Sequence, residues 1–139
     1  ARARDLMSAE FVTISESATM TSIRRHFQNS PETGFFVIDD EGRLSGTLSF
    51  ADVKDVAFEA GLDDLINARD AARANPAFVE AGDNLERALA LMDASGDDHL
   101  AVVDNIADRR VIGILHHRAV LREYNRALLK AHDEEHDNI

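Results

Sequence analysis

The sequence predicts an α+β fold in which one β-α-β-β-α unit occurs twice. Short apolar segments typical of strands alternate with segments that carry an apolar residue every three or four positions, which is the period of an amphipathic helix. The same succession of patterns returns after 65 residues. Because a lone unit of about 60 residues buries only about 60% of its chain surface, we expect the two copies to pack as one pseudo-two-fold symmetric pair.

The first repeat covers residues 11–61 and follows a short lead-in helix within residues 1–10. A strand over 11–14 leads to a helix with Met20, Ile23 and Phe27 on one face, capped by Ser17 or Thr19. Residues 35–38 and 44–48 predict two strands joined by a polar turn, which is typical of a hairpin. A helix over 50–60 then ends at Gly61.

The second repeat covers residues 77–131 and repeats this pattern. We expect strands near 77–79, 100–103 and 111–115, a helix that begins after Asn84, and a closing helix over 117–131. Residues 62–76 are helix-prone and precede Pro76, so they predict a linker helix between the repeats. Residues 132–139 are acidic without apolar periodicity, which predicts a disordered tail.

Composition excludes several classes of function. The 139 residues include 15 Lys and Arg against 26 Asp and Glu, and a net charge of −11 disfavours binding to nucleic acid or to anionic lipid. The absence of cysteine excludes a disulfide framework, a thiol nucleophile and thiolate metal sites. Apolar runs are only a few residues long, so we expect a soluble fragment without direct membrane insertion.

A signature shared by the two repeats resembles cystathionine-β-synthase (CBS) domains in tandem, the Bateman module, over about residues 5–131. In the first repeat it reads Val37-Ile38-Asp39 and then Gly46-Thr47-Leu48-Ser49-Phe50-Ala51-Asp52. In the second it reads Val102-Val103-Asp104 and then Gly113-Ile114-Leu115-His116-His117-Arg118-Ala119. His116 and Ala119 stand where the family has Ser or Thr and Asp, so the second copy is degenerate.

Two further segments are similar to the cytoplasmic ends of bacterial ClC chloride channels and transporters. They are Leu65-Ile66-Asn67-Ala68-Arg69-Asp70 and Leu121-Arg122-Glu123-Tyr124-Asn125-Arg126-Ala127-Leu128-Leu129. This resemblance implies a regulatory, non-catalytic domain at the cytoplasmic face of the inner membrane, joined to the membrane portion of a longer ion-channel chain and paired as a homodimer. The alternatives are a CBS module of another protein, or a ligand-free dimerisation scaffold.

The CBS resemblance also implies a site for an adenine nucleotide, with AMP, ADP or ATP as candidate regulatory ligands and no required cofactor. Asp52 would accept hydrogen bonds from the ribose hydroxyls, and Ser49 at a helix start would face a phosphate. Thr13, Ile14, Phe35 and Phe36 would frame the adenine. The full set of implied site residues is Thr13, Ile14, Phe35, Phe36, Gly46, Thr47, Leu48, Ser49 and Asp52.

Each candidate site has a simpler interpretation. Ser49 and Asp52 have the spacing of a helix capping box, which needs no ligand. In the second, degenerate cleft, His116, His117 and Arg118 could donate to a phosphate, but three polar residues also suit a solvated helix start.

No residues suggest catalysis or a metal ion. The segment from His132 to His136 matches a His-x-x-Glu-His metallopeptidase pattern, but its acidic surroundings favour a solvated tail. No serine stands beside a histidine in a motif typical of nucleophilic catalysis. We therefore expect neither an enzyme nor a metal site.

Overall fold

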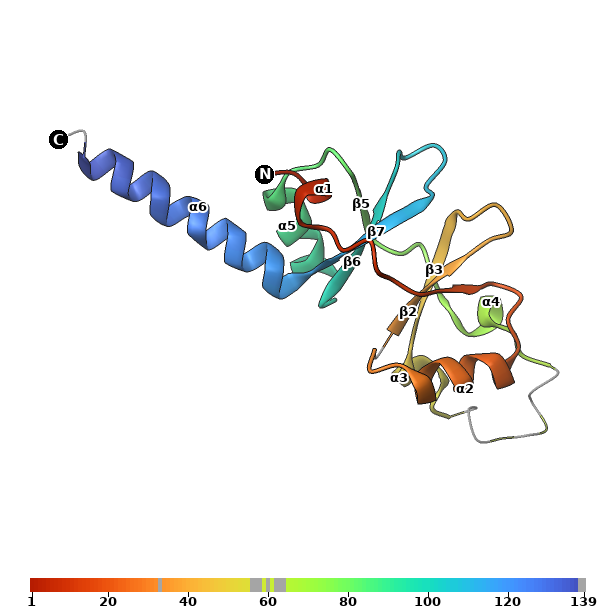
Figure 1. The fold of residues 1–139 in the computed structure, drawn as a ribbon. Helices are drawn as coiled ribbons and strands as arrows, with labels where there is room; N and C mark the ends of the chain where they lie inside the picture. Colours follow the sequence, from red (N-terminus) through yellow and green to blue (C-terminus); the bar gives the residue numbers. More distant parts are fainter. Residues whose placement is uncertain (33, 56–58, 60, 62–64, 138–139) are drawn as a thin grey trace. The chain divides into compact units, whose positions relative to one another are not determined.

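The computed structural model describes residues 1–137 except 33, 56–58, 60 and 62–64, and it divides into two compact units (Figure 1). The first-repeat unit consists of residues 11–76 and 107–111. The second-repeat unit consists of residues 1–10, 77–106 and 112–139. Both contain a sheet and helices, so the α+β class is confirmed.

The first-repeat unit has a four-stranded sheet in the order β1-β2-β3-β4. Its strands are β1 (Thr13–Ser15), β2 (Gly34–Ile38), β3 (Leu44–Ser49) and β4 (Arg73–Ala74). β1 and β2 are parallel and are joined through helix α2 (Met20–Asn29), whereas β3 is antiparallel to both β2 and β4. A parallel pair needs such a crossover, while β2 and β3 form the expected hairpin.

The core of this unit lies between the sheet and its helices α2, α3 (Phe50–Val53) and α4 (Ala68–Ala71). The side chain of Thr19 accepts from the backbone N–H of Ser22 and so begins α2 at the predicted position. Apolar side chains from the strands and the helices form one buried cluster. Its members are Ile14, Met20, Ile23, Phe35, Val37, Leu48, Val53 and Ala68.

The second-repeat unit has a three-stranded sheet in the order β5-β6-β7. Its elements are α1 (Ala3–Leu6), β5 (Phe78–Glu80), α5 (Leu85–Ser95), β6 (His99–Val103), β7 (Val111–His116) and α6 (His117–Asp137). Helix α5 begins at Asn84, whose side chain accepts from the N–H of Arg87, and ends at Gly96, whose left-handed φ of 73° favours glycine. Its buried core draws on α1, all three strands, α5 and α6.

Each short lead-in helix packs with the repeat that does not follow it. α1 precedes the first repeat but belongs to the second-repeat unit, where the N–H of Ala3 donates to the carbonyl of Asp83 at 2.8 Å. α4 precedes the second repeat but belongs to the first-repeat unit, where the N–H of Ala68 donates to the carbonyl of Ala18 at 2.9 Å. The 65-residue offset therefore extends to these helices, which both carry the sequence Ala-Arg-Asp.

Two predicted segments differ from the structure. The described part of the predicted linker helix over 62–76 contains only the four-residue α4 and then strand β4, because β4 pairs with the edge of β3; residues 62–64 lie outside the described part. The tail predicted to be disordered over 132–139 is helical as far as Asp137. Neither Gly nor Pro interrupts residues 117–137, so α6 continues as a solvated helix.

Two other helices are shorter than their predictions. The lead-in helix within residues 1–10 spans only Ala3–Leu6. The helix predicted over 50–60 is seen as Phe50–Val53, and part of its remainder, 56–58 and 60, lies outside the described residues.

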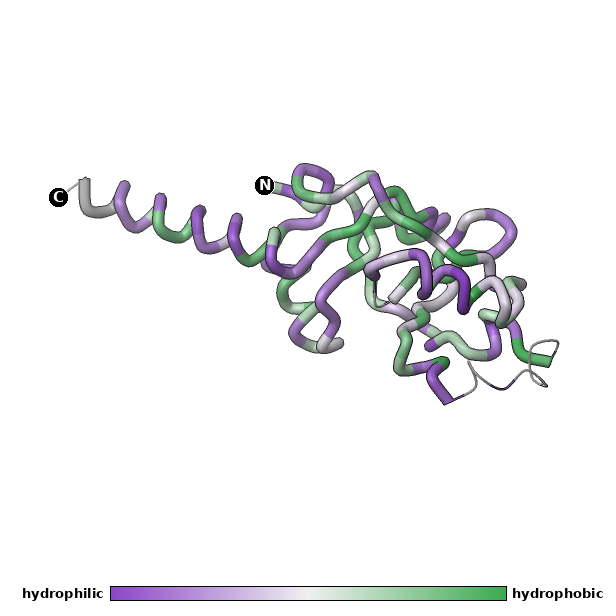
Figure 2. The backbone as a smooth tube through the Cα atoms, turned by 60° about the horizontal axis from the view of Figure 1, so that its bottom comes forward, coloured by the Kyte–Doolittle hydropathy of each residue, from purple (hydrophilic) through white to green (hydrophobic). Residues whose placement is uncertain are grey.

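Helix α6 is the longest helix, and hydrophilic and hydrophobic residues alternate along it (Figure 2). Its first turn packs on the core through the fully buried Val120, whereas Leu128 and Leu129 are exposed. None of the helices in the described ranges combines the length and apolar character that a membrane span requires.

Gly46 in β3 and Gly113 in β7 allow the residues that follow helices α4 and α1 to pack closely against these strands. A Cβ on Gly46 would lie 2.8 Å from the carbonyl oxygen of Arg73, and a Cβ on Gly113 would lie 2.5, 2.9 and 3.0 Å from Sδ, Cγ and Cβ of Met7. A backbone oxygen cannot move without its strand, whereas a change of rotamer moves Sδ and Cγ of Met7 away and leaves only its Cβ in close contact. The two positions therefore differ in their tolerance of a methyl group.

We predict that Gly46→Ala lowers the free energy of unfolding by about 1–3 kcal/mol, because the added methyl group overpacks against backbone. Gly113→Ala should lower the free energy of unfolding by less, because the side chain of Met7 can change its rotamer. Gly82→Ala is the control, because a Cβ there meets nothing within 4 Å. Urea unfolding of the three variants measures the order, and an equal cost at Gly46 and Gly82 would contradict the close approach.

Candidate functional site

The junction of β3 and α3 holds the Ser49 and Asp52 pair as a complete capping box. The backbone N–H of Ser49 donates to Oδ2 of Asp52 at 2.9 Å, and the Ser49 hydroxyl donates to the same oxygen at 2.8 Å. In return, the Asp52 N–H donates to the Ser49 hydroxyl oxygen at 3.3 Å. The capping interpretation is therefore realised, and the Ser49 hydroxyl is already engaged in it.

Arg73 holds the other oxygen of the same carboxylate. Its Nε donates to Oδ1 of Asp52 at 2.9 Å, across 21 positions of sequence. The Asp52 side chain is only 12% exposed, whereas that of Arg73 is 71% exposed. A carboxylate offers about four acceptor positions, so these contacts already occupy about three of them.

The surroundings of Asp52 act on its pKa in opposite directions. Burial raises the pKa, whereas hydrogen bonds from the backbone and side chain of Ser49 and the bond and charge of Arg73 lower it. The net result is a pKa below the ordinary value of 3.8. Asp52 is therefore held as a carboxylate, the form that accepts hydrogen bonds.

The register of the sheet divides the other predicted site residues between its two faces. Thr13, Phe36 and Thr47 are cross-strand neighbours in one row and so share a face. Ile14, Phe35 and Leu48 belong to the buried cluster on the face that the helices cover. Gly46 is buried against Arg73. Among the side chains of this set, Thr13 and Thr47 are partly exposed polar groups on the first face.

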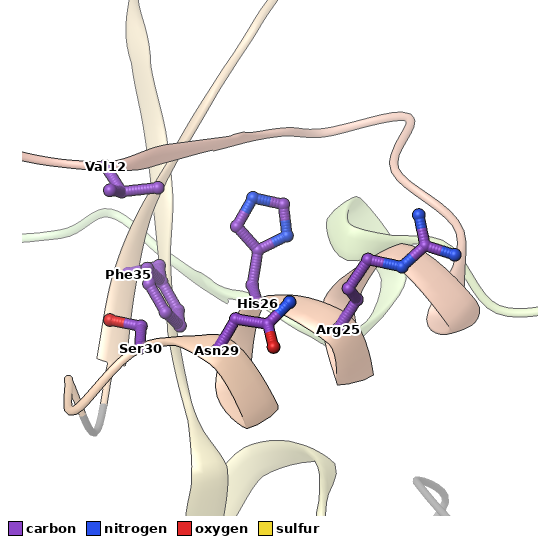
Figure 3. Close-up of a pocket in the computed structure, with 6 residues that line it drawn as sticks. All are labelled: Val12, Arg25, His26, Asn29, Ser30 and Phe35. Atoms are coloured by element: carbon purple, nitrogen blue, oxygen red, sulfur yellow. The ribbon is translucent and has the colours of Figure 1, made fainter.

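A hollow of about 270 Å³ lies at the first-repeat unit beside Phe35. Figure 3 shows the His26 ring standing between Val12 and Phe35 on one side and Arg25 on the other. The His26 and Phe35 rings meet edge to face, with centroids 5.7 Å apart. Nδ1 of His26 lies 2.9 Å from the carbonyl oxygen of Ser22, which leaves the Nε2 side of the ring for other contacts. Val12, Arg25, His26, Asn29, Ser30 and Phe35 line the hollow.

The hollow and the capping box lie at the same end of the sheet. β1 and β2 are parallel, and β2 begins at Gly34, which pairs with Ser49 at the end of the antiparallel β3. The starts of β1 and β2 and the end of β3 therefore share one edge. This edge brings an aromatic surface and a carboxylate to one region of the unit.

Sequence reasoning missed His26, Val12 and Arg73 as site residues. His26 lies three positions after Ile23 on the inner part of α2, and this spacing was an available signal. Val12 directly precedes the predicted Thr13. Arg73 had no local signal, because its strand of two residues is defined only by pairing with β3.

The second candidate cleft is a hollow of about 490 Å³ in the second-repeat unit. His116, His117 and Arg118 line it together with Asp98, so the three predicted donors do gather there. The backbone N–H of His117 donates to the carbonyl oxygen of Asp98 at 2.7 Å. This contact joins the first residue of α6 to the turn that precedes β6.

The equivalents of Asp52 and Arg73 are both missing from the second-repeat unit. Ala119 stands six residues after Gly113, as Asp52 does after Gly46. Ser8 pairs with Ile114 after Gly113, as Arg73 pairs with Thr47 after Gly46. Neither the carboxylate nor its cationic partner is therefore repeated.

A metal centre finds no support within the described residues. Nowhere in them do three or more His, Cys, Asp or Glu side chains gather closely enough to hold an ion. The segment from His132 to His136 lies in the last turns of α6, where His132, Asp133 and Glu134 are exposed, and residues 138–139 lie outside the described part.

Comparisons with known proteins agree with the repeat. A family model for the CBS domain matches residues 3–59 and again 68–126. Hypoxic response protein 1 of Mycobacterium tuberculosis is 26% identical over 114 residues, which cover 81% of this chain and 78% of that protein. These matches extend across both repeats.

Solved structures with this fold include several with a bound nucleotide. The crystal structure of CBSX2 in complex with AMP has a TM-score of 0.75 and 26% identity, covering 91% of this chain and 97% of that one. A CBS domain pair/ACT domain protein from Thermotoga maritima has a TM-score of 0.75 and 25% identity, covering 92% and 99%. The cytosolic domain of the Mg²⁺ channel MgtE in complex with ATP has a TM-score of 0.72 and 25% identity, covering 87% and 48%.

We predict that the charge of Asp52 stabilises the fold in a pH-dependent way. Because its folded pKa is lowered, this contribution is present above the ordinary pKa of 3.8 and is lost as the pH falls through the folded value. The stability difference between the wild type and Asp52→Asn should therefore be constant near neutrality and shrink in acid.

Urea unfolding at several pH values between 7 and 3 measures this difference. Asp40→Asn, at an exposed turn position, is the control with the same change of charge. A difference for Asp52→Asn that grows on acidification, or that follows the control, would show that the capping and ion-pair contacts do not hold the carboxylate.

Proposed function

Since the chain belongs to the CBS domain family, we propose that it is a regulatory, non-catalytic module that binds an adenine nucleotide in its first-repeat unit. The observation that carries this proposal is the shared sheet edge, where a carboxylate and an aromatic hollow occur together. CBSX2 with AMP and the MgtE cytosolic domain with ATP are similar in fold and in sequence. They support an adenine nucleotide as the ligand class.

In this proposal the adenine ring occupies the hollow and stacks against His26 or Phe35, since edge and face contacts between aromatic rings are favourable. Asp52 accepts from the ribose, with Oδ1 as the oxygen that Ser49 leaves available. β1 is the outer strand of the sheet, so backbone groups of Thr13 and Ile14 on its outer side supply hydrogen bonds to the base. Gly46, Thr47 and Leu48 belong to β3, which leads directly to Ser49 and Asp52. In this proposal they position the carboxylate of Asp52 and do not contact the ligand through large polar side chains.

The second-repeat unit has a smaller part in this proposal. His116, His117 and Arg118 offer donors for an anion, but Ala119 offers no acceptor for ribose. We therefore expect one nucleotide site, in the first-repeat unit.

We predict that Asp52→Ala weakens the binding of AMP by about tenfold or more, the loss typical of hydrogen bonds to a charged group. Isothermal titration with AMP, ADP and ATP measures it. Asp70→Ala is a matched control, because Asp70 completes the equivalent capping box with Asn67 and carries the same charge. It should keep wild-type affinity.

The outcomes separate a sensor from a scaffold. A loss confined to Asp52→Ala supports the sensor. An equal loss in both variants indicates that capping alone matters. Absence of heat with all three nucleotides, from folded protein, would leave a ligand-free dimerisation scaffold as the better account.

We further infer that this module regulates a ClC-type chloride channel or transporter. The resemblance rests on residues 65–70, which include the Asn67 cap of α4, and on 121–129 within α6. The module would then lie at the cytoplasmic face of the inner membrane and pair with a second copy, as part of a longer chain. The MgtE structure favours the rival, a CBS module on a magnesium transport protein.

We predict that the gene encodes several apolar segments of about 20 residues upstream of Ala1. Chloride flux through the full-length protein in liposomes should change when AMP is added and should lose this response in Asp52→Ala. A ligand shifts such an equilibrium only by its differential affinity for two states. Magnesium transport without chloride transport would contradict the ClC assignment.

A further inference from the structure

We propose that Arg73 is a built-in competitor of the ligand, because its guanidinium occupies the oxygen of Asp52 that a ribose hydroxyl needs. Binding of a ribose then requires Arg73 to leave the carboxylate. This inference rests on the proposed nucleotide site, and it states that Arg73 lowers the affinity of that site for a ribose.

The contacts of the carboxylate make the competition direct. Oδ2 of Asp52 accepts from the N–H and the hydroxyl of Ser49, and Oδ1 accepts from Nε of Arg73. About one acceptor position is left beside these bonds. Two neighbouring hydroxyls of a ribose need two positions, so both cannot be accepted while Arg73 stays.

The two sets of contacts differ in how easily they break. The Ser49 bonds are local to the capping box and belong to the start of α3. Arg73 reaches the carboxylate from another strand with a side chain that is 71% exposed. A released guanidinium is readily hydrated, because the Arg73 side of this ion pair already lies largely in solvent. Arg73 is therefore the contact that a ligand would displace.

The fold holds the competitor beside its carboxylate. The backbone of Arg73 pairs with Thr47 in β3, and its carbonyl oxygen lies against Gly46. The backbone is therefore fixed, while the side chain extends into solvent. After displacement, the guanidinium remains tethered near the site and can return when the ligand leaves.

The second-repeat unit offers an internal comparison. Ser8 has the strand position of Arg73, and Ala119 has the motif position of Asp52. The cation is absent where the carboxylate is absent. This joint difference links the role of Arg73 to Asp52 rather than to the packing of the lead-in segment, which is retained in both units.

Arg73 could compete with the ribose for Asp52 or attract a phosphate of the ligand. Binding of adenosine, which has no phosphate, tests the first effect alone. Because adenosine is uncharged, Arg73 has no anionic group of the ligand to attract. Loss of Arg73 should therefore tighten adenosine binding, although it makes an acidic protein still more negative. Added salt should tighten binding to the wild type as well, since screening weakens the ion pair.

The test is isothermal titration of the wild type, Arg73→Met and Arg69→Met with adenosine and with 2′,3′-dideoxyadenosine. Methionine keeps much of the aliphatic stem and removes the donor. Arg69 is the matched control, since it is an exposed arginine on the neighbouring α4. We expect Arg73→Met to bind adenosine about two- to fivefold more tightly, with no gain in Arg69→Met or with the dideoxy compound.

A second measurement needs no ligand. Titration of the Asp52 carboxyl by NMR should show a higher pKa in Arg73→Met than in the wild type, and no change in Arg69→Met. An unchanged pKa in Arg73→Met would mean that the ion pair is not formed in solution and would overturn the inference.

The outcomes distinguish the two proposals. Equal or weaker adenosine binding by Arg73→Met overturns the competitor role while nucleotide binding stands. A gain that extends to the dideoxy compound also overturns it, because the ribose hydroxyls would not be involved. Absence of binding by adenosine and AMP in every variant overturns the nucleotide site, and the competitor role with it.

Discussion

The close approach of strand β4 to Gly46 in β3 is the constraint on which the candidate site depends. The carbonyl oxygen of Arg73 lies where a Cβ at position 46 would clash, so only glycine lets β4 pair with β3 at this register. That pairing sets the backbone of Arg73 beside Thr47. The guanidinium can then reach the carboxylate at the start of α3, and one close contact connects strand pairing to the charge of the site.

The same constraint explains why each unit is built from distant parts of the chain. A lead-in segment completes the sheet edge of the repeat that it does not precede, and Gly113 admits Met7 as Gly46 admits the segment of Arg73. Each unit therefore closes a long loop before its core is complete, which costs chain entropy. Burial of Ala3 and Ala68, both 0% exposed, offsets part of this cost.

Sequence patterns could predict the elements that carry their own signals. The strand at 35–38, the cap at Thr19 and the box at Ser49 and Asp52 all follow from local residue types, and the 65-residue offset revealed the repeat. The lead-in helices have four residues each, too few to show a period. Their exchange between repeats is a property of long-range pairing, which no local window contains.

The site shows the same division. Asp52 was found because its motif is contiguous with β3, whereas Arg73 lies 21 residues away on a strand that exists only through its partner. The prediction of a disordered tail over 132–139 was wrong because it took the loss of apolar periodicity as the end of the helix. Helix α6 continues to Asp137 without that periodicity. A solvated helix needs only residues of adequate propensity and no breaker.

The asymmetry between the repeats follows from how a carboxylate and a cation depend on each other. Asp52 is 12% exposed, and a partly buried carboxylate is stable only with donors that replace water. Ser49 and Arg73 supply those donors in one unit. Where Ala119 replaces the carboxylate, an arginine at the position of Ser8 would lack the partner that Arg73 has in Asp52. The first-repeat unit therefore keeps both groups, the carboxylate of Asp52 and the guanidinium of Arg73.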